Sequence, residues 1–405
     1  MLHSLVNKRG AQKWASLLLF FLAPVIVLLI TGCGPDDANA DRLKVEERDE
    51  LPFPLTDRTY KARNLELIKL DGKRFLLNNN FSIYDTVNEL EVYSFDEQRL
   101  IRRIDLLSDT KDFSRIHDLI YLDHDSIFFT RPGARDPYKT HFLRMDSSGK
   151  VLEKWTFSGD LPEMNAQLMM GGGRIFSPLT YRQGTFYSSV YPERRELEGS
   201  VFAHPHTARI TLKEDPNPRV ELFGSYPSTY KKVDQEMLPE QSLQTIKPFG
   251  TFDHAFANGS IVFSYPFIDT LYRYTLDGKL LTKKQVKSEY VEPQKVWEHL
   301  KSNGRDGLKK AYPKGPKAYP HYFLLIHDPY RNLFYRTVNL GPEHASIMIL
   351  DQKLRVLKET RLKKKPAPHM MPFLGRSMPA EEGLFIPRRG KDEFHFRSLK
   401  IEMRH

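Results

Sequence analysis

The sequence predicts an all-β protein, specifically a six-bladed β-propeller with two insertions. Six short apolar segments recur along the chain at intervals that indicate one structural repeat. Most are followed by stretches in which apolar and polar residues alternate between tight turns, which is typical of antiparallel sheets. Almost no segment has the period of a long helix. An irregular β-sandwich is the alternative, because the units share few residues.

The apolar segments begin 52, 48, 86, 72 and 51 residues apart, so three intervals are nearly equal and two contain insertions. The segments are residues 74–79, 126–131, 174–179, 260–265, 332–337 and 383–388. Each propeller sheet buries its faces against neighbouring sheets, so a regularly repeated unit fits this fold. We expect each segment to be the innermost strand of its blade.

Alternation predicts the strands that follow. The clearest example is residues 269–281, where Asp277-Gly278 supplies the positive φ of a hairpin turn. Similar alternation occurs at residues 90–95, 140–145, 207–212 and 346–350. We expect the segment near residues 60–70 to complete the sheet begun by residues 384–401, because joining the two ends removes an exposed edge.

The two insertions differ in character. Residues 213–249 are polar and rich in proline. Residues 293–302 begin with proline and end before Asn303-Gly304, which predicts a short helix. Val296, Trp297 and Leu300 would share one face of this helix, and we expect it to cap one mouth of the propeller.

Residues 1–32 are predicted to be a lipoprotein signal peptide. Lys8, Arg9 and Lys13 precede an apolar run over residues 15–30. A membrane span needs about 20 residues, so cleavage is favoured over a permanent transmembrane anchor.

The apolar run ends in Ile30-Thr31-Gly32-Cys33, which contains the single cysteine of the chain. This tetrapeptide resembles the bacterial lipobox, and the resemblance implies acylation of Cys33, for example with palmitate. Several acyl chains anchor firmly, because each buried CH₂ contributes about 0.8 kcal/mol. Residues 33–55 are polar and charged and are predicted to form a flexible tether, with the propeller domain over residues 56–405.

The location of the protein is predicted from the start of the mature chain. Asp36 and Asp37 resemble a surface-export signal of some Gram-negative bacteria, so we expect an outer-membrane lipoprotein that faces either the periplasm or the outside. Loss of the signal lowers the formal net charge from +10 to +7. The surplus is spread along the chain without a nucleic-acid motif, so nucleic acid is not an expected partner. A lone cysteine excludes internal disulfides and cysteine-based zinc sites.

One part of the chain resembles a known family. An apolar strand is followed by a loop, then by the segment from Asp269 to Tyr274, and then by the turn at Asp277-Gly278-Lys279. This order resembles that found in six-bladed propeller lipoproteins of bacterial outer membranes. Many of those belong to an uncharacterised-domain family. The resemblance covers residues 60–403 and implies the fold, not an activity.

Propellers usually bind ligands at one end of the central channel, so residues just past the innermost strands are candidate binding residues. They are Asn78, Asn79, Arg131, Tyr265, Arg336, Arg388 and Arg389. Arginine suits carboxylate and phosphate groups, which predicts a pocket for an anion or acidic sugar. The alternative is that these arginines form ion pairs between blades with acids such as Asp328, Glu343 and Glu382.

Several histidines have metal-ligating neighbours. The candidates are His204-Pro205-His206, Asp253-His254, His327-Asp328 and His117-Asp118. Because no cysteine ligand or HExxH pattern accompanies them, structural or solvent-facing histidines are favoured. No metal and no cofactor is therefore predicted.

The sequence contains no Gly-x-Ser-x-Gly motif and no recognisable order of Ser, His and Asp, so no catalytic residue can be named. The predicted function is lipid-anchored binding or scaffolding in the cell envelope, with a glycan, a peptide or an envelope protein recognised through one propeller face. The alternative is a hydrolase or lyase that acts on acidic carbohydrate at the channel mouth. An acid and a base clustered in the channel would favour the enzyme, and a filled channel with an exposed apolar rim would favour the scaffold.

Overall fold

The structure, a computed structural model, describes residues 43–54, 62–81, 88–106, 118–123, 125–132, 139–158, 160–161, 166–170, 179–192, 201–212, 217–237, 252–299, 301–302, 319–341, 344–363, 377–389 and 393–403. The predicted signal peptide and Cys33 lie outside these residues. The chain divides into two compact units, Met1–Lys44 with Glu402–His405, and Val45–Ile401. The second unit contains the propeller.

Six antiparallel sheets make up this unit, and they are numbered as blades in chain order. Blade 1 contains β2 (Ala62–Leu70), β3 (Lys73–Phe81), β4 (Asn88–Ser94) and β5 (Arg99–Asp105). Blade 2 contains β6 (Asp118–Asp123), β7 (Ser126–Pro132), β8 (Lys139–Met145) and β9 (Val151–Ser158). Blade 3 contains β12 (Thr180–Arg182), β13 (Thr185–Pro192), β14 (Thr207–Thr211) and β15 (Arg219–Phe223), with β10 (Asp160–Leu161) and β11 (Ala166–Met170) attached to β13.

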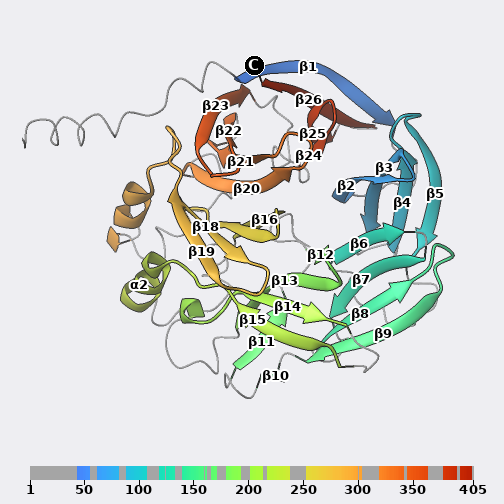
Figure 1. Ribbon diagram of the computed structural model, residues 1–405, viewed down its shortest axis with the longest axis horizontal. Coiled ribbons are helices and arrows are strands. Elements are labelled where there is room, and N and C mark those ends of the chain that lie inside the picture. Colours follow the sequence, from blue (N-terminus) through green and yellow to red (C-terminus); the bar gives the residue numbers. More distant parts are fainter. Residues whose placement is uncertain are drawn as a thin grey trace, which may run out of the picture. The chain divides into compact units, whose positions relative to one another are not determined.

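The remaining three blades have four strands each. Blade 4 contains β16 (Asp253–Ala257), β17 (Ser260–Ser264), β18 (Thr270–Thr275) and β19 (Leu280–Gln285). Blade 5 contains β20 (His321–Asp328), β21 (Leu333–Asn339), β22 (His344–Leu350) and β23 (Val356–Lys363). Blade 6 contains β24 (Met378–Ala380), β25 (Gly383–Arg389), β26 (Glu393–Met403) and β1 (Leu43–Pro54). Figure 1 shows the blades following one another around a central axis, so the predicted six-bladed β-propeller is confirmed.

The hydrophobic core lies between neighbouring blades. Leu77 and Leu90 of blade 1 pack with Ile127 and Phe129 of blade 2, and similar clusters join blades 2 and 3 and blades 4 and 5. Because a middle strand of a blade contacts sheets on both sides, its residues are buried on both faces, as the pattern of β17 shows. Period-two alternation is therefore weakest where burial is greatest.

This burial explains an error in the assignment of innermost strands. Five of the six apolar segments are strands, but β3, β7, β17, β21 and β25 are each the second strand of a blade. The innermost strands are β2, β6, β12, β16, β20 and β24. Of the third segment, residues 174–178 lie outside the described residues, and the second strand of blade 3 is β13.

The closure of the ring also differs from the prediction. Strand β1, and not the segment near residues 60–70, completes the sheet of blade 6, whereas β2 is the innermost strand of blade 1. The predicted tether extended to residue 55, but residues 43–54 form this strand. Its charged sequence indicated a tether because an outermost strand needs few apolar residues. In β1, Phe53 is fully buried and packs against Phe396 of β26.

The turns and the helical insertion follow the sequence more closely. Gly278 has a φ of 89° in the β18–β19 turn, as the Asp-Gly pair predicted. Residues 293–299 and 301–302 are helical, which confirms the predicted helix. Val296 and Trp297 pack against blade 4 together with Tyr230 of α2 (Ser228–Met237), so this helix lies beside the blade instead of capping a channel mouth.

A 3₁₀ turn, η5 (Val201–Ala203), precedes α2, and Phe202 of this turn packs against Tyr230. Among the described residues, no helix is both long enough and apolar enough to cross a membrane.

Candidate functional site: the central channel

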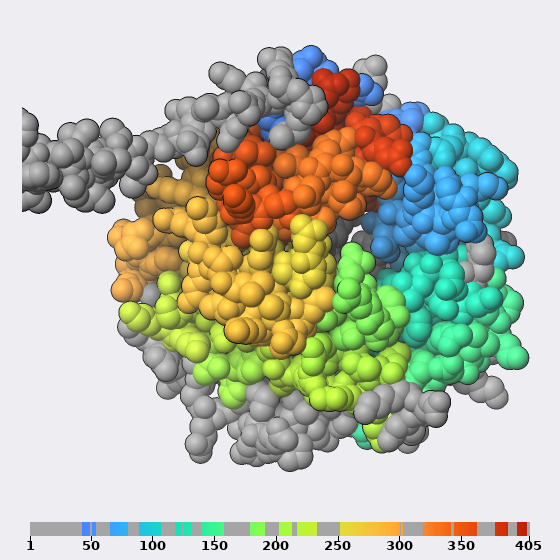
Figure 2. Space-filling view, in the orientation of Figure 1, coloured from blue at the N-terminus to red at the C-terminus, as the bar shows by residue number. Residues whose placement is uncertain are grey.

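One cavity of about 450 Å³ receives residues from the innermost strand of every blade. We call it the central channel, and it is lined by residues 65–67, 118–122, 179–182, 254–256, 326, 327, 329 and 377–379. Figure 2 shows a hollow where the blue, green, yellow and orange segments meet. Because six separate segments of the chain meet there, the channel exists only in the folded ring.

The wall formed by blades 3 to 5 contains nitrogen-bearing side chains. Arg182 stands at the end of β12 and is exposed, with its Cζ 5.8 Å from the ring of Phe256. His327 lies near the end of β20, and its pKa is lowered mainly by burial. Asn332 and Asp328 partly oppose this shift, and the guanidinium groups of Arg182 and Arg273 add to it. The imidazole of His327 is therefore neutral at pH 7.

A second histidine lies deeper in the same wall. His254 of β16 is buried, and its Nε2 is 3.4 Å from Oγ1 of Thr180 on β12. The neighbouring Asp253 accepts a hydrogen bond from the backbone N–H of Leu325 at 2.7 Å, which ties β16 to β20. These contacts fix the positions of both histidine-bearing strands.

The opposite wall contains carboxylates. Glu66 of β2 is exposed in the channel, and Asp118 of β6 is buried at its edge. Tyr121 lies on the same strand as Asp118, and burial raises the pKa of its hydroxyl. The channel thus has acidic groups on blades 1 and 2 and basic or imidazole groups on blades 3 to 5.

The structure places Arg336 away from this channel. It is fully buried between blades 4 and 5, where its guanidinium donates to Ser264 Oγ (2.9 Å) and to the carbonyls of Val286 (3.0 Å) and Ile268 (2.7 Å). Its Cζ is 3.3 Å from the centroid of the Tyr322 ring. Burial lowers the pKa of Arg336 to about 10, which still leaves it charged at pH 7.

Tyr265 and Asn78 are also fully buried. The Tyr265 carbonyl accepts from Arg336 at 3.4 Å, and its hydroxyl lies 2.7 Å from Nε2 of His206. Asn78 donates to Glu91 within blade 1 at 2.8 Å. The fold therefore brings Tyr265 and Arg336 together, but at a junction between blades and apart from Asn78.

Arg131 and Arg388 belong to β7 and β25, and their side chains lie outside the described residues. Two acids expected to pair between blades do bind arginines, although not those proposed from the sequence. Asp328 pairs with Arg331, and Glu382 pairs with Arg74. Glu343 lies outside the described residues.

Sequence reasoning missed Arg182 and treated three channel residues as separate metal candidates. His254, His327 and Asp118 were each noticed beside an acid or a histidine, and the fold brings all three to one channel. In the described part of the chain, no group of three or more His, Cys, Asp or Glu side chains is placed to hold a metal ion. The Gln183-Gly184 turn after Arg182, with positive φ at both residues, was the available signal for β12 and β13.

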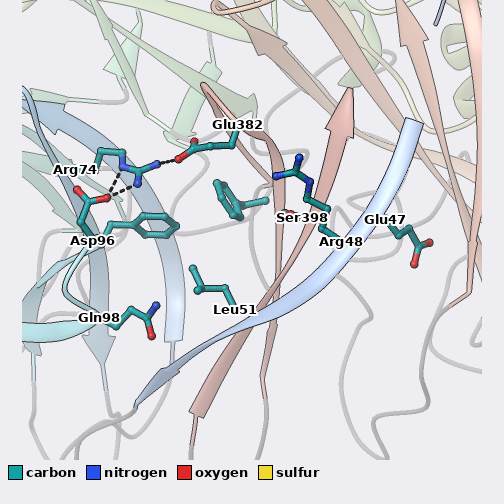
Figure 3. Close-up of a pocket in the computed structure, with 10 residues that line it drawn as sticks. Glu47, Arg48, Leu51, Arg74, Asp96, Gln98, Glu382 and Ser398 are labelled. Atoms are coloured by element: carbon teal, nitrogen blue, oxygen red, sulfur yellow. Dashed lines mark hydrogen bonds and ion pairs between the residues drawn. The ribbon is translucent and has the colours of Figure 1, made fainter. Parts of the chain in front are cut away.

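A second cavity, of about 740 Å³, lies at the junction of blades 6 and 1 (Figure 3), and we call it the closure pocket. It is lined by Glu47, Arg48, Leu51, Arg74, Phe95, Asp96, Gln98, Glu382, Phe385 and Ser398. One of its two arginines, Arg74, binds both Asp96 and Glu382, as the dashed lines of Figure 3 show. Because these carboxylates already neutralise Arg74, and because residues from all six blades line the central channel, the channel is the better candidate for ligand binding.

Comparison with known proteins supports the fold. Residues 42–361 match the family model described as Domain of unknown function (DUF4221). A crystal structure of a DUF4221 family member from Bacteroides vulgatus superposes with a TM-score of 0.63 at 14% sequence identity, over 90% of this chain and 99% of that chain. At this identity the likeness shows the fold alone.

Two further solved structures superpose with lower TM-scores. A protein of unknown function from Bacteroides caccae has a TM-score of 0.38 at 11% identity, with 76% of this chain and 84% of that chain covered. The Dos1 propeller has a TM-score of 0.35 at 12% identity, with 82% and 65% covered. No curated protein matches this chain.

Proposed function

This chain belongs to the DUF4221 family, and from that premise we propose that it is a lipid-anchored binding protein of the bacterial cell envelope that captures its ligand in the central channel. The observation that carries the proposal is the open cavity of about 450 Å³ to which all six innermost strands contribute. Pockets for small ligands commonly measure about 300–1,000 Å³ and combine apolar walls with a few polar groups. A short glycan or peptide segment matches these dimensions.

The chemistry of the walls agrees with a binding role. Tyr181 and Phe256 offer aromatic surface, and Glu66 and Arg182 offer charged groups at the same opening. Because the polar side chains come from strands and not from long loops, their positions are set before a ligand arrives. A preformed site loses less conformational entropy on binding.

The test of this proposal is a thermal-shift screen of the full-length chain in detergent against neutral glycans, acidic sugars and short peptides. A ligand at about a hundred times its Kd should stabilise the fold by roughly 2.7 kcal/mol. Glu66→Trp fills the channel and should abolish the shift. Lys284→Trp, on the exposed outermost strand β19, is the matched control and should leave it unchanged. A shift that persists in Glu66→Trp would place the ligand elsewhere and contradict the proposal.

The envelope location rests on the segment that ends in Cys33. We expect radiolabelled palmitate to label the wild-type chain and the Cys33→Ser variant to remain an unlabelled precursor. Fractionation of wild-type cells should recover the protein with the outer membrane. Equal labelling of both chains would contradict acylation at Cys33.

A hydrolase or lyase acting on acidic carbohydrate is the second candidate, because carboxylates and histidines line the same cavity. General acid and base groups must lie within reach of one substrate, and this channel holds Asp118, His254 and His327. Incubation of each ligand from the screen with the protein distinguishes the two functions. Release of a new product, lost in His254→Gln, would favour the enzyme, whereas recovery of unchanged ligand would favour binding alone.

A further inference from the structure

Arg182 differs from three arginines at the blade junctions in what its guanidinium contacts. Arg336, Arg331 and Arg74 are held by carbonyl or carboxylate oxygens at the blade junctions. In the part of the chain that the structure describes, the only hydrogen bond of the Arg182 guanidinium is from Nη1 to the carbonyl of Tyr181, its neighbour, at 3.3 Å. No described carboxylate pairs with Arg182, and its side chain is exposed at the channel.

The Arg182 guanidinium is also oriented by its surroundings. Its Cζ lies 5.8 Å from the ring of Phe256, a distance at which a guanidinium is attracted to an aromatic face. The residue stands directly before the tight Gln183-Gly184 turn, so its backbone belongs to a defined hairpin between β12 and β13. An oriented guanidinium loses less entropy when it forms a bidentate pair.

A second arginine, Arg273, is close enough to His327 to affect its pKa. Arg273 of β18 donates to the carbonyl of Gln352 at 2.8 Å, and its Cζ lies 5.7 Å from the ring of Phe334. Its Nε is buried and has no partner among the described residues. Burial has the largest effect on the pKa of His327 and lowers it, Asn332 and Asp328 raise it, and the nearby guanidinium groups of Arg182 and Arg273 lower it further.

Two acids near His327 and Arg273, Asp328 and Asp351, form ion pairs with other arginines. Asp328 accepts from Arg331 at 3.0 Å and from the Tyr335 hydroxyl at 2.5 Å. Asp351 pairs with Arg355 at 2.6 Å, although it also attracts Arg273. Asp328 and Asp351 are therefore paired with Arg331 and Arg355 and not with Arg182.

The position of His327 is fixed by the same turns. The amide of Gln352 donates to the carbonyl of Asn332 at 2.7 Å, and its Nε2 lies 3.4 Å from Nε2 of His327. Asn258 of the neighbouring blade donates to Oε1 of Gln352 at 2.8 Å. Three turns from blades 4 and 5 thus lock the imidazole beside the channel opening.

We propose that Arg182 and His327 form a subsite that receives an anionic group, a carboxylate or a phosphate, of the ligand bound in the central channel. This inference rests on the proposed function, because it identifies the chemistry of one end of that ligand. Arg182 supplies the planar pair of donors that carboxylate and phosphate oxygens match. His327 supplies one further polar contact, and the Phe256 ring lies 5.8 Å from Cζ of Arg182.

The test uses a matched pair of sugars, glucuronate and glucose, with inorganic phosphate as a separate probe. Binding to the full-length chain in detergent is measured by calorimetry at constant ionic strength. We expect glucuronate or phosphate to bind at least about tenfold more tightly than glucose, and Arg182→Gln to remove that preference. Arg74→Gln, in the closure pocket, is the control and should retain it. Tighter binding of glucuronate identifies a carboxylate site, and tighter binding of phosphate identifies a phosphate site.

Two outcomes overturn the subsite. One is equal affinity for glucose and both anions, including no binding of any of them, and the other is a preference that survives in Arg182→Gln. The proposed function is judged separately by Glu66→Trp. If a ligand from the screen is lost in Glu66→Trp but binds equally to Arg182→Gln, the channel binds ligands and only the anionic subsite is wrong. If no ligand depends on Glu66→Trp, the channel proposal itself fails.

Discussion

Two junctions between blades each contain an arginine that binds across the junction, but one arginine is buried and the other is partly exposed. Between blades 4 and 5, Arg336 of β21 reaches across to carbonyls of blade 4 and has no exposed surface. Between blades 6 and 1, Arg74 of β3 binds Glu382, and these side chains are 28% and 43% exposed. The first junction is dry and closely packed, whereas the second contains the closure pocket.

The difference teaches which contacts hold the ring. Removing a buried guanidinium that donates to carbonyls leaves several buried polar groups without a hydrogen-bond partner, so it lowers the free energy of unfolding strongly. An exposed ion pair is screened by water and salt and contributes little. We therefore expect the junction of blades 6 and 1 to be stabilised mainly by the pairing of β1 with β26 and by the packing of Phe53.

The largest expected effect is at the dry junction. Arg336→Ala should lower the free energy of unfolding by roughly 3–5 kcal/mol, because it leaves buried carbonyls of blade 4 and the Ser264 hydroxyl without their donor. Chemical denaturation followed by circular dichroism measures this loss. A loss below about 1 kcal/mol would show that water replaces the guanidinium, and would contradict the conclusion that the buried Arg336 stabilises its junction more than the exposed Arg74 does.

An intermediate effect is expected between blades 5 and 6. Arg331 is mostly buried and donates to the carbonyls of Ile401 (3.0 Å) and Ala380 (2.9 Å) as well as to Asp328. Arg331→Ala should cost about 2–3 kcal/mol, since these are charged hydrogen bonds to backbone acceptors. Equal losses of unfolding free energy in Arg331→Ala and Arg74→Ala would show that the burial of the arginine does not determine how much it stabilises a junction.

Acid should weaken the region of blades 3 and 4 through His206. Burial lowers the pKa of His206 in the folded protein to about 3, whereas the unfolded chain takes up this proton near pH 6.5. Between these values the unfolded state binds more protons, so stability falls as the pH falls. The contribution of this group is about 1.4 kcal/mol per pH unit below pH 6.5. Denaturation curves at pH 7 and 5 should differ by less in His206→Gln than in the wild type, and identical differences would contradict this assignment.

A small effect is expected at the wet junction. Arg74→Gln should lower the free energy of unfolding by about 0.2–1 kcal/mol, and less at 1 M salt, because the ion pairs with Asp96 and Glu382 are solvent-exposed. Parallel denaturation curves at low and high salt measure the difference. A loss comparable to that of Arg336→Ala would mean that the closure depends on this arginine after all.

The smallest effect is expected in the channel. Arg182→Gln should change the free energy of unfolding by less than about 0.5 kcal/mol, because among the described residues its exposed guanidinium donates only to the Tyr181 carbonyl and lies near the Phe256 ring. The same denaturation assay measures it. A larger loss would identify Arg182 as a structural residue and remove it from the proposed subsite.

The sequence by itself determined the repeat, most of the strands and the turns. Strands β3, β7, β17, β21 and β25 were found because their residues are apolar on both faces, and Gly278 marked its hairpin because the turn requires positive φ. The helix at residues 293–299 was found from its proline and its spacing of apolar residues. These features depend on local preferences that a short segment carries within itself.

Only the tertiary structure decided which strand lines the channel and which arginine faces it. The innermost strands β12 and β24 have three residues each, too few for alternation to be read. Arg336 and Arg182 look alike in the sequence. Arg336 donates to acceptors 50 to 72 residues away in blade 4, whereas among the described residues Arg182 donates only to the carbonyl of its neighbour Tyr181. Burial of a charged side chain depends on partners that come close only when the ring is formed, so spacing along the chain does not encode it.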